Sequence, residues 1–219
     1  MTTPDKAGSP EDLGTVEIFG ANFSTFTRSI LTGLHEVGIP FIQHSHVPHS
    51  QEIKKRNPFG LLPVLVHRPD GLYTSPENVV TLFESNAIRR YIDEALVPNH
   101  PSRQVLTPDL VPKQAQSARL RARVDQFVSA ISMTLFPTIE TGVVKPVIRM
   151  EKNGADQATI SVALEENLQS MELSLGKLEQ MILVNGQGQG QWVMGNIFTW
   201  ADLFLYPILA DLKSLPQVS

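Results

Sequence analysis

Asn57-Pro58-Phe59-Gly60-Leu61-Leu62-Pro63-Val64-Leu65 is the stretch that decides the fold of the first half of the chain. Pro63 opens an apolar, strand-like run and removes a backbone donor, which predicts a place at the edge of a sheet. A cis Leu62–Pro63 bond would leave the N–H and C=O of Leu62 pointing outward, where an extended peptide could pair with them. A trans proline without a ligand is the alternative, and residue spacing alone favours it because only ~5–6% of X–Pro bonds are cis.

Short apolar runs separated by turn residues surround this stretch. From Thr25 the apolar spacing becomes helical, and Gly38 followed by Pro40 ends the helix. A second helical pattern begins at Glu84, and extended runs are expected at residues 15–19, 41–47, 61–67 and 78–83. The first half is therefore predicted as strand, helix, strand, then strand, strand, helix, which indicates an α/β domain.

The second half has helical periodicity throughout. Two apolar stripes predict long helices, one formed by Leu120, Val124, Phe127, Val128, Ile131 and Leu135 and the other by Leu164, Leu168, Met171, Leu175, Leu178 and Ile182. Pro137 and Pro146 lie between the stripes, so kinks or breaks are expected there. Residues 97–112 contain four prolines and suit a linker, whereas residues 185–191 alternate glycine with polar amides and suit a flexible loop.

Glu84-Ser85-Asn86-Ala87-Ile88-Arg89-Arg90-Tyr91-Ile92 places a carboxylate and a hydroxyl where a strand becomes a helix. Free N–H groups at a helix start attract a carboxylate, and a serine there can add a hydrogen bond. Glu84 could pair with an ammonium group, so an α-amino acid head such as a γ-glutamyl group supplies both partners. Simple helix capping by Ser85 is the alternative, and it is the commoner use of such a serine.

Gly20-Ala21-Asn22-Phe23-Ser24-Thr25-Phe26-Thr27-Arg28 is also a strand-to-helix junction, with two hydroxyls at the expected helix start. A hydroxyl and backbone amides that converge there would stabilise a thiolate and lower a thiol pKa from the ordinary ~8.5 toward neutrality. Capping by Ser24 or Thr25 is the alternative, and one residue can serve both purposes.

Composition excludes several classes of function. The net charge of −4 argues against a nucleic-acid partner and against adhesion to anionic membranes. No stretch approaches the ~20 consecutive apolar residues of a membrane helix. The chain has no cysteine, so disulfides, thiolate zinc sites and cysteine nucleophiles are excluded. Residues 1–13 are polar and acidic, which predicts a disordered leader, and a cytoplasmic protein is expected.

Three histidines suggest a metal site at first sight. His44 and His46 are alternate residues of an expected strand and would share one face, and His49 follows closely. However, no carboxylate or cysteine completes an obvious set, and structural zinc normally has four ligands. No metal site is predicted.

Together, these segments resemble the glutathione transferase family. Residues 57–65 are similar to its N-P-F-G-x-x-P segment with a cis-proline, and residues 84–92 to its E-S-x-A-I-x-x-Y-I segment. Residues 20–28 are similar to the G-x-x-x-S-T-x-T-R helix start of phi-like members, in which the serine is catalytic. Residues 195–202 resemble a helix-start segment of the second domain, a capping box whose role is in folding.

The resemblance implies roles for individual residues. Ser24 would donate its hydroxyl hydrogen to the glutathione thiolate, with Thr25 and Asn22 close enough to compete for that role. Leu62, beside cis-Pro63, would hold the cysteinyl backbone. Glu84 and Ser85 would bind the γ-glutamyl end of glutathione.

The resemblance also implies the architecture: a thioredoxin-like domain over residues 14–96, a linker over 97–112 and an all-helical domain over 113–219. A small hydrophobic electrophile or aromatic ligand would lie between the domains, walled partly by the helix that carries Val124, Phe127 and Ile131. Glutathione would be the co-substrate, with no metal or redox cofactor. A homodimer is expected, whereas nucleic acid and membrane are not expected as partners.

Several positions depart from the family pattern. Leu61 stands where phi-like members often have glutamine. His49 is the nearest match for a ligand of the glycyl carboxylate, with Lys54 and Lys55 as substitutes. Residues 72–76 lengthen a hairpin, which predicts an extra flap near the ligand or the dimer partner. The chain also stops soon after the capping-box helix, so further helices of the family are expected to be missing, either because the family tail is short here or because the sequence is incomplete.

A serine-type transferase that conjugates glutathione to small hydrophobic electrophiles in detoxification is the predicted function. A ligandin that binds apolar or aromatic compounds is one alternative, and a glutathione-dependent peroxidase is another. A structural or regulatory relative without activity is the third, because a fold does not determine the activity that it carries. Mixed-disulfide chemistry is disfavoured because no cysteine exists to carry it.

Overall fold

The computed structural model describes residues 13–99, 117–184 and 190–216, and the chain divides into two compact units, Met1–Pro108 and Asp109–Ser219. Most of the expected leader, linker and glycine-rich loop lies outside the described residues. The first residues of the expected linker are helical instead, as α4 (Val97–Asn99). Val97 is buried there, so the ordered first unit extends beyond the predicted boundary at residue 96.

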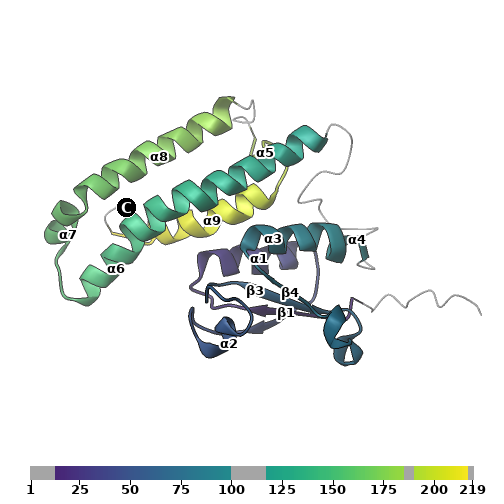
Figure 1. The fold of residues 1–219 in the computed structure, drawn as a ribbon. Coiled ribbons are helices and arrows are strands. Elements are labelled where there is room, and N and C mark those ends of the chain that lie inside the picture. The colour runs from purple at the N-terminus through teal and green to yellow at the C-terminus, as the bar shows by residue number, and fades with distance from the viewer. Residues whose placement is uncertain (1–12, 100–116, 185–189, 217–219) are drawn as a thin grey trace, which may run out of the picture. The chain divides into compact units, whose positions relative to one another are not determined.

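The first unit is built on a four-stranded sheet with the order β2-β1-β3-β4 (Figure 1). The strands are β1 (Thr15–Phe19), β2 (Ile42–His44), β3 (Val64–Arg68) and β4 (Val80–Phe83). β1 pairs with β2 in parallel and with β3 antiparallel, and β3 pairs antiparallel with β4. Each strand lies within the run predicted for it, except that β3 ends one residue later.

The helices of the first unit are α1 (Thr25–Glu36), α2 (Gln51–Lys54) and α3 (Ser85–Tyr91), and α3 continues through the π-helical segment η3 (Ile92–Leu96). In Figure 1, α1 and α3 lie over one face of the sheet and α2 lies on the opposite side. Ile53 of α2 packs there with Phe19, Val64 and Val66. This is the predicted thioredoxin-like arrangement.

Pro63 does not lie on an edge strand, contrary to the prediction. It immediately precedes β3, which has β1 on one side and β4 on the other. The missing N–H is tolerated because Pro63 stands just before the strand, where no ladder hydrogen bond is needed. The Leu62–Pro63 bond is cis, as the resemblance implies and against the trans alternative.

The β3–β4 hairpin contains two 3-10 turns, η1 (Gly71–Tyr73) and η2 (Pro76–Asn78). The extra residues predicted at 72–76 therefore form these turns. Leu72 and Tyr73 are 97% and 94% exposed, so the turns project their apolar side chains away from the first unit.

The second unit is mainly helical in its described residues. Its helices are α5 (Ser117–Ala130), α6 (Lys145–Lys152), α7 (Gln157–Ala163), α8 (Glu165–Val184) and α9 (Trp200–Lys213). The first predicted stripe is its core, since Val124, Phe127, Val128 and Ile131 are fully buried. Met171 and Leu178 are the buried members of the second stripe within α8.

Pro137 and Pro146 do not break the helix, so the expected break is wrong, whereas the alternative of a kink stays a prediction. α5 and α6 are joined by the π-helical segments η5 (Ile131–Leu135) and η6 (Pro137–Val144), so the helix runs on through both prolines. A π-helical turn shifts the hydrogen-bond pattern locally and can accommodate a residue that has no N–H to donate.

This continuous helix, Ala118–Lys152, is long and apolar enough to cross a membrane by length and composition alone. Its mean hydropathy is 1.4 over an 18-residue window, of which 44% is buried. The core helix of a soluble protein passes the same test, so the finding is weak evidence for a membrane span.

Candidate functional site

One row of paired residues brings the predicted site segments to the same end of the sheet. Phe19 is in register with His44 on one side and Val64 on the other, and Val64 is in register with Phe83. β1, β2 and β4 end at this row and antiparallel β3 begins there. Since adjacent paired strands lie ~4.8 Å apart, the segments next to the row follow one another across the sheet in the order 45–49, 20–24, 62–63 and 84–85, each starting beside the next.

Ser24 is the N-cap of α1 and is half-buried. Its Oγ accepts a hydrogen bond from the Thr27 N–H at 3.4 Å. Capping uses the oxygen as an acceptor and leaves the hydroxyl hydrogen available to a ligand. The capping role and a thiolate-stabilising role are therefore compatible in one residue.

The two residues that compete with Ser24 are placed differently. Thr25 is 5% exposed as the first residue of α1. Asn22 is exposed, and its Oδ1 accepts a hydrogen bond from Gln43 Nε2 at 2.7 Å. Of the two hydroxyls, the one on Ser24 is therefore the more accessible.

Asn57 holds the loop that leads into the cis Leu62–Pro63 bond. Its side chain is almost fully buried, its Nδ2 donates to the Leu61 carbonyl at 3.0 Å, and its Oδ1 accepts from the Phe59 N–H at 3.0 Å. Among the described residues, the N–H and C=O of Leu62 have no hydrogen-bond partner. Pairing of these groups with an extended ligand is compatible with this geometry and stays a prediction.

Glu84 and Ser85 lie where β4 passes into α3, beside Val64 and Pro63. Glu84 is the N-cap residue, with φ 68° and ψ 113° and no capping hydrogen bond from its side chain. The alternative of capping by Ser85 is wrong, because Ser85 is already the first helical residue. A positive φ at a non-glycine residue costs on the order of 1–3 kcal/mol and is typically retained at functional sites. Glu84 itself is exposed.

Comparisons with known proteins show what the first unit and the fold are similar to. Residues 23–95 match the family model for the glutathione S-transferase N-terminal domain. A search of curated protein sequences found no match.

Solved structures with the same fold include several glutathione transferases. Glutathione transferase F7 from Populus trichocarpa is 23% identical, with a TM-score of 0.67 over 94% of this chain and 86% of that chain. A diazinon-metabolizing glutathione S-transferase from the silkworm Bombyx mori is 18% identical, with a TM-score of 0.66 over 93% and 83%. FzlA from C. crescentus is 17% identical, with a TM-score of 0.70 over 93% and 80%. These likenesses establish the two-part fold.

His49 lies in the loop between β2 and α2. Its backbone has φ 62°, and its N–H donates to the Gly60 carbonyl at 2.7 Å. Gly60 has φ 71°, and a Cβ there would come within 2.5 Å of His49 Nδ1, so only glycine fits. The His49 side chain is exposed. Beside it, Ser50 Oγ is buried and has no hydrogen-bond partner within the described part of the chain.

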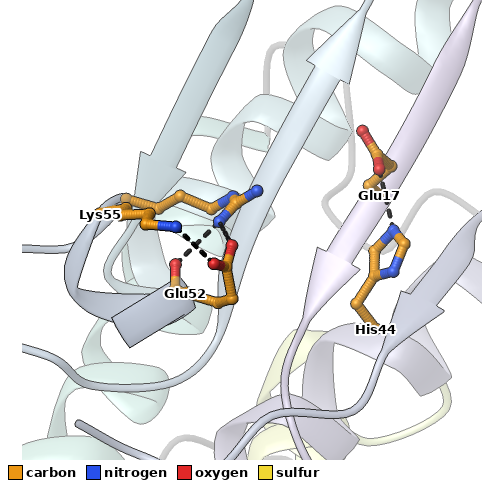
Figure 2. A network of polar contacts seen from close by, with 5 residues as sticks. Glu17, His44, Glu52 and Lys55 are labelled. Atoms are coloured by element: carbon orange, nitrogen blue, oxygen red, sulfur yellow. Dashed lines mark hydrogen bonds and ion pairs between the residues drawn. The ribbon is translucent and has the colours of Figure 1, made fainter. Parts of the chain in front are cut away.

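Lys54 and Lys55, the substitutes for His49, are both exposed on or next to α2. Lys55 Nζ lies 2.6 Å from Glu52 Oε1, and Arg56 Nη1 lies 3.0 Å from Glu52 Oε2 (Figure 2). The hydrogen bonds from Lys55 and then Arg56 lower the pKa of Glu52 to about 2. Lys55 thus has a local partner that stabilises α2.

His44 is engaged with β1. Its Nε2 lies 2.8 Å from Glu17 Oε1, as Figure 2 shows, and its ring stacks on Phe19 with the centroids 4.5 Å apart. The His46 ring also stacks on Phe19, at 5.9 Å. Among the residues that the structure describes, no group of three or more His, Cys, Asp or Glu side chains could hold a metal ion.

The capping box predicted in the second unit is present at the start of α9. Asp202 Oδ2 accepts from the Thr199 N–H at 2.8 Å, and Thr199 Oγ1 accepts from the Ala201 N–H at 3.3 Å. Asp202 Oδ1 also accepts from the Val193 N–H at 2.7 Å. Burial raises the pKa of Asp202, and these hydrogen bonds act in the opposite direction.

Gln43, Ser50 and the positive φ of Glu84 were not identified from the sequence. Gln43 and Ser50 belong to no motif, and their positions become informative only when β2 is placed beside β1. The strained backbone of Glu84 has no sequence signal, because positive φ is normally inferred from glycine or asparagine.

Proposed function

We propose that the protein is a serine-type glutathione transferase that joins the glutathione thiolate to small hydrophobic electrophiles. The observation that carries the proposal is the register row Phe19–Val64–Phe83. The segment that leads to Ser24, the Leu62 backbone and the Glu84–Ser85 pair all adjoin this row at one end of the sheet, which supports the proposal. A tripeptide whose head carries both an ammonium and a carboxylate, and whose central residue carries a thiol, requires these three kinds of partner.

In this proposal, glutathione binds as a short extended strand. The N–H and C=O of Leu62 pair with the cysteinyl backbone, as in strand addition. The Glu84 carboxylate pairs with the ammonium group of the γ-glutamyl end, and Ser85 bonds its carboxylate. These contacts bring the glutathione sulfur to the start of α1.

Ser24 then acts on the sulfur. Its hydroxyl donates a hydrogen bond to the thiolate, which lowers the thiol pKa from the ordinary ~8.5. The thiolate attacks the electrophilic carbon and forms a carbon–sulfur bond, and the electron pair leaves with the displaced group or on the acceptor atom. The thiol proton passes to solvent, so this step needs no resident cofactor.

The glycyl carboxylate of glutathione is assigned to the loop before α2. The exposed His49 side chain can supply a cation, and Ser50 Oγ supplies a hydroxyl whose hydrogen bond is not used within the described chain. Lys54 is a further exposed cation on the same helix. His49→Ala is expected to raise the KM for glutathione more than it lowers kcat.

A homodimer remains part of the proposal. The family resemblance supports it, and the first unit has exposed apolar side chains at Phe59 (66%) and Leu61 (50%) of the kind that interfaces cover. Sedimentation velocity at micromolar concentration tests it. A monomer under those conditions would exclude the dimer and leave the proposed chemistry untouched.

The test of the enzyme is turnover of a chromogenic electrophile with glutathione. Ser24→Ala should lower kcat on the order of 10²-fold, the usual effect of removing one donor to a developing anion. It should also move the pH–rate profile toward the pKa of free glutathione. Thr25→Val tests the competing hydroxyl, and the exposed Ser161→Ala is the surface control.

Unchanged activity in Ser24→Ala would exclude Ser24 as the thiol activator. Dye displacement without turnover on a broad panel of electrophiles would favour a ligandin. The absence of glutathione binding by calorimetry would point to a structural or regulatory relative.

A further inference from the structure

The segment between β1 and Ser24 is held by a side chain from the neighbouring strand. Gln43 is the middle residue of β2, and its Nε2 donates to the Gly20 carbonyl at 3.0 Å and to Asn22 Oδ1 at 2.7 Å. One amide nitrogen therefore binds two points of the turn that leads to α1. We propose that Gln43 is a positioning residue for Ser24, an inference that rests on the proposed function.

Both hydrogens of the Gln43 amide nitrogen are used. The Gly20 carbonyl can only accept, so the nitrogen of Gln43 must face it. The same nitrogen then requires an acceptor from Asn22, and the Asn22 Oδ1 supplies it. The donor end of the Asn22 amide is consequently turned away from Gln43. A side chain must carry two donor hydrogens on one atom to make both of these hydrogen bonds.

The backbone of the turn continues this restraint to Ser24. The Gly20 N–H donates to the His44 carbonyl at 3.0 Å, which extends the pairing of β1 with β2 beyond Phe19. The Ser24 N–H donates to the Ala21 carbonyl at 3.0 Å. Gly20 also has no room for a side chain, because a Cβ would come within 2.5 Å of Thr27. Gln43 is the side chain that fixes the middle of a turn already anchored at both ends.

Position matters here because the serine hydroxyl must point at a sulfur held by other residues. Leu62, Glu84 and Ser85 place the glutathione, whereas Gln43 and Asn22 place the hydroxyl. A displacement of about 1 Å in such an arrangement can cost on the order of 10²-fold in rate. Loss of Gln43 should therefore affect the thiolate more than it affects glutathione binding.

Gln43→Leu and Gln43→Glu test the inference in the full chain. Leucine removes both hydrogen bonds, and glutamate has the same length but presents an acceptor to the Gly20 carbonyl. We expect kcat to fall on the order of tenfold in both, with a change of less than about twofold in the KM for glutathione. The pH–rate profile should shift upward, because a misplaced hydroxyl stabilises the thiolate less.

Asn22→Ala and the double variant Asn22→Ala/Gln43→Leu test the route of the effect. If Gln43 acts through Asn22, the two losses should not multiply in the double variant. Gln169→Leu, an exposed glutamine on α8, is the matched control and should behave as wild type. Calorimetric titration with glutathione separates misplacement from misfolding, because a folded variant keeps its affinity.

An unchanged kcat and pH profile in a Gln43→Leu protein that binds glutathione normally would overturn the inference and leave the proposed function standing. Equal losses in kcat and in glutathione affinity would also overturn it, since they indicate a general structural role. A wild-type protein without glutathione-dependent turnover would refute the proposed function and this inference together.

Discussion

Among single residues, Asn57 shows how a buried polar side chain can hold the loop that leads into a proposed binding site. Its amide is almost completely removed from water and bonds two backbone groups of the same loop, the Leu61 C=O and the Phe59 N–H. The loop leads to Leu62, whose own backbone has no hydrogen-bond partner within the described part of the chain. The strained φ of Glu84 lies at the same end of the sheet. The strained backbone of Glu84 thus lowers the stability of the fold at the end of the sheet where the Leu62 backbone is available for hydrogen bonds.

Asn57→Ala is expected to lower the free energy of unfolding by about 2 kcal/mol, because two backbone groups in a buried loop lose their partner. It should also weaken glutathione binding, since the Leu62 backbone is no longer held. Urea unfolding and calorimetric titration measure the two effects. The exposed Asn153→Ala serves as the control. A loss of stability with unchanged glutathione affinity would show that the loop keeps its shape without the amide.

Glu52 provides a prediction on pH. Hydrogen bonds from Lys55 and then Arg56 lower its pKa from 4.5 to about 2. Because the folded-state pKa is depressed, the ionised carboxylate stabilises the fold above pH 4.5. This contribution is lost as the pH falls from 4.5 toward about 2. Glu52→Gln should therefore be less stable than wild type at neutral pH and should lose less stability over that interval.

Unfolding midpoints in urea at several pH values between 2 and 7, compared for wild type and Glu52→Gln, measure this difference. The exposed Glu166→Gln is the matched control, because it has the same change in charge on a different unit. Parallel stability curves for wild type and Glu52→Gln would mean that the two ion pairs contribute nothing measurable, as is common for exposed pairs.

At the scale of elements, the sequence predicted those strands and helix starts that depend on interactions between residues close together in the chain. β1 and the start of α1 were found from an apolar run, a break at Gly20 and a capping serine, all of which act over a few residues. The continuous helix Ala118–Lys152 was not predicted, because Pro137 and Pro146 were judged by the rule that a proline inside an α-helix kinks or breaks it. The π-helical segments η5 and η6 let the helix continue past the prolines, and no sequence pattern predicts such segments.

The site was predictable to a similar degree. Ser24, Leu62, Pro63, Glu84 and Ser85 each belong to a contiguous motif, so the resemblance proposed them without a structure, and their roles stay predictions. The place of Pro63 was wrong, because the order of strands in a sheet is not encoded in any one strand. Gln43 acts across β1 and β2, a contact that no spacing along the chain reveals.

The capping box of α9 is the element whose contribution is simplest to measure. Thr199 is fully buried, accepts from the Ala201 N–H and donates to Asp202 Oδ2 at 3.2 Å. Thr199→Ala should lower the free energy of unfolding by about 1–2 kcal/mol, the usual cost of losing an N-cap side chain. Urea unfolding followed by circular dichroism tests this, with the exposed Ser161→Ala as the control. A change within about 0.5 kcal/mol, typical of surface substitutions, would contradict it.

For the whole molecule, the location of all proposed glutathione residues in one of the two units has a consequence for the free energy of unfolding. Every residue assigned to glutathione lies in Met1–Pro108, whereas the capping box and the long helix lie in Asp109–Ser219. A ligand that binds only the folded state stabilises that state by mass action. Glutathione should therefore stabilise the unit that holds its site, and the second unit should respond only as far as the two units unfold together.

Glutathione at about 100 times its Kd should raise the free energy of unfolding by about 2.7 kcal/mol. Ser24→Ala should retain most of this increase, because Ser24 acts on the sulfur whereas the Leu62 backbone, Glu84 and Ser85 hold the peptide. Glu84→Gln should lose part of it, because the ammonium group of the γ-glutamyl end then faces a neutral amide. Thermal unfolding with and without glutathione measures the increase in each variant. Cysteinylglycine, which lacks the γ-glutamyl group, is the control ligand, and equal stabilisation by the two peptides at equal concentration would contradict the assignment of Glu84 and Ser85.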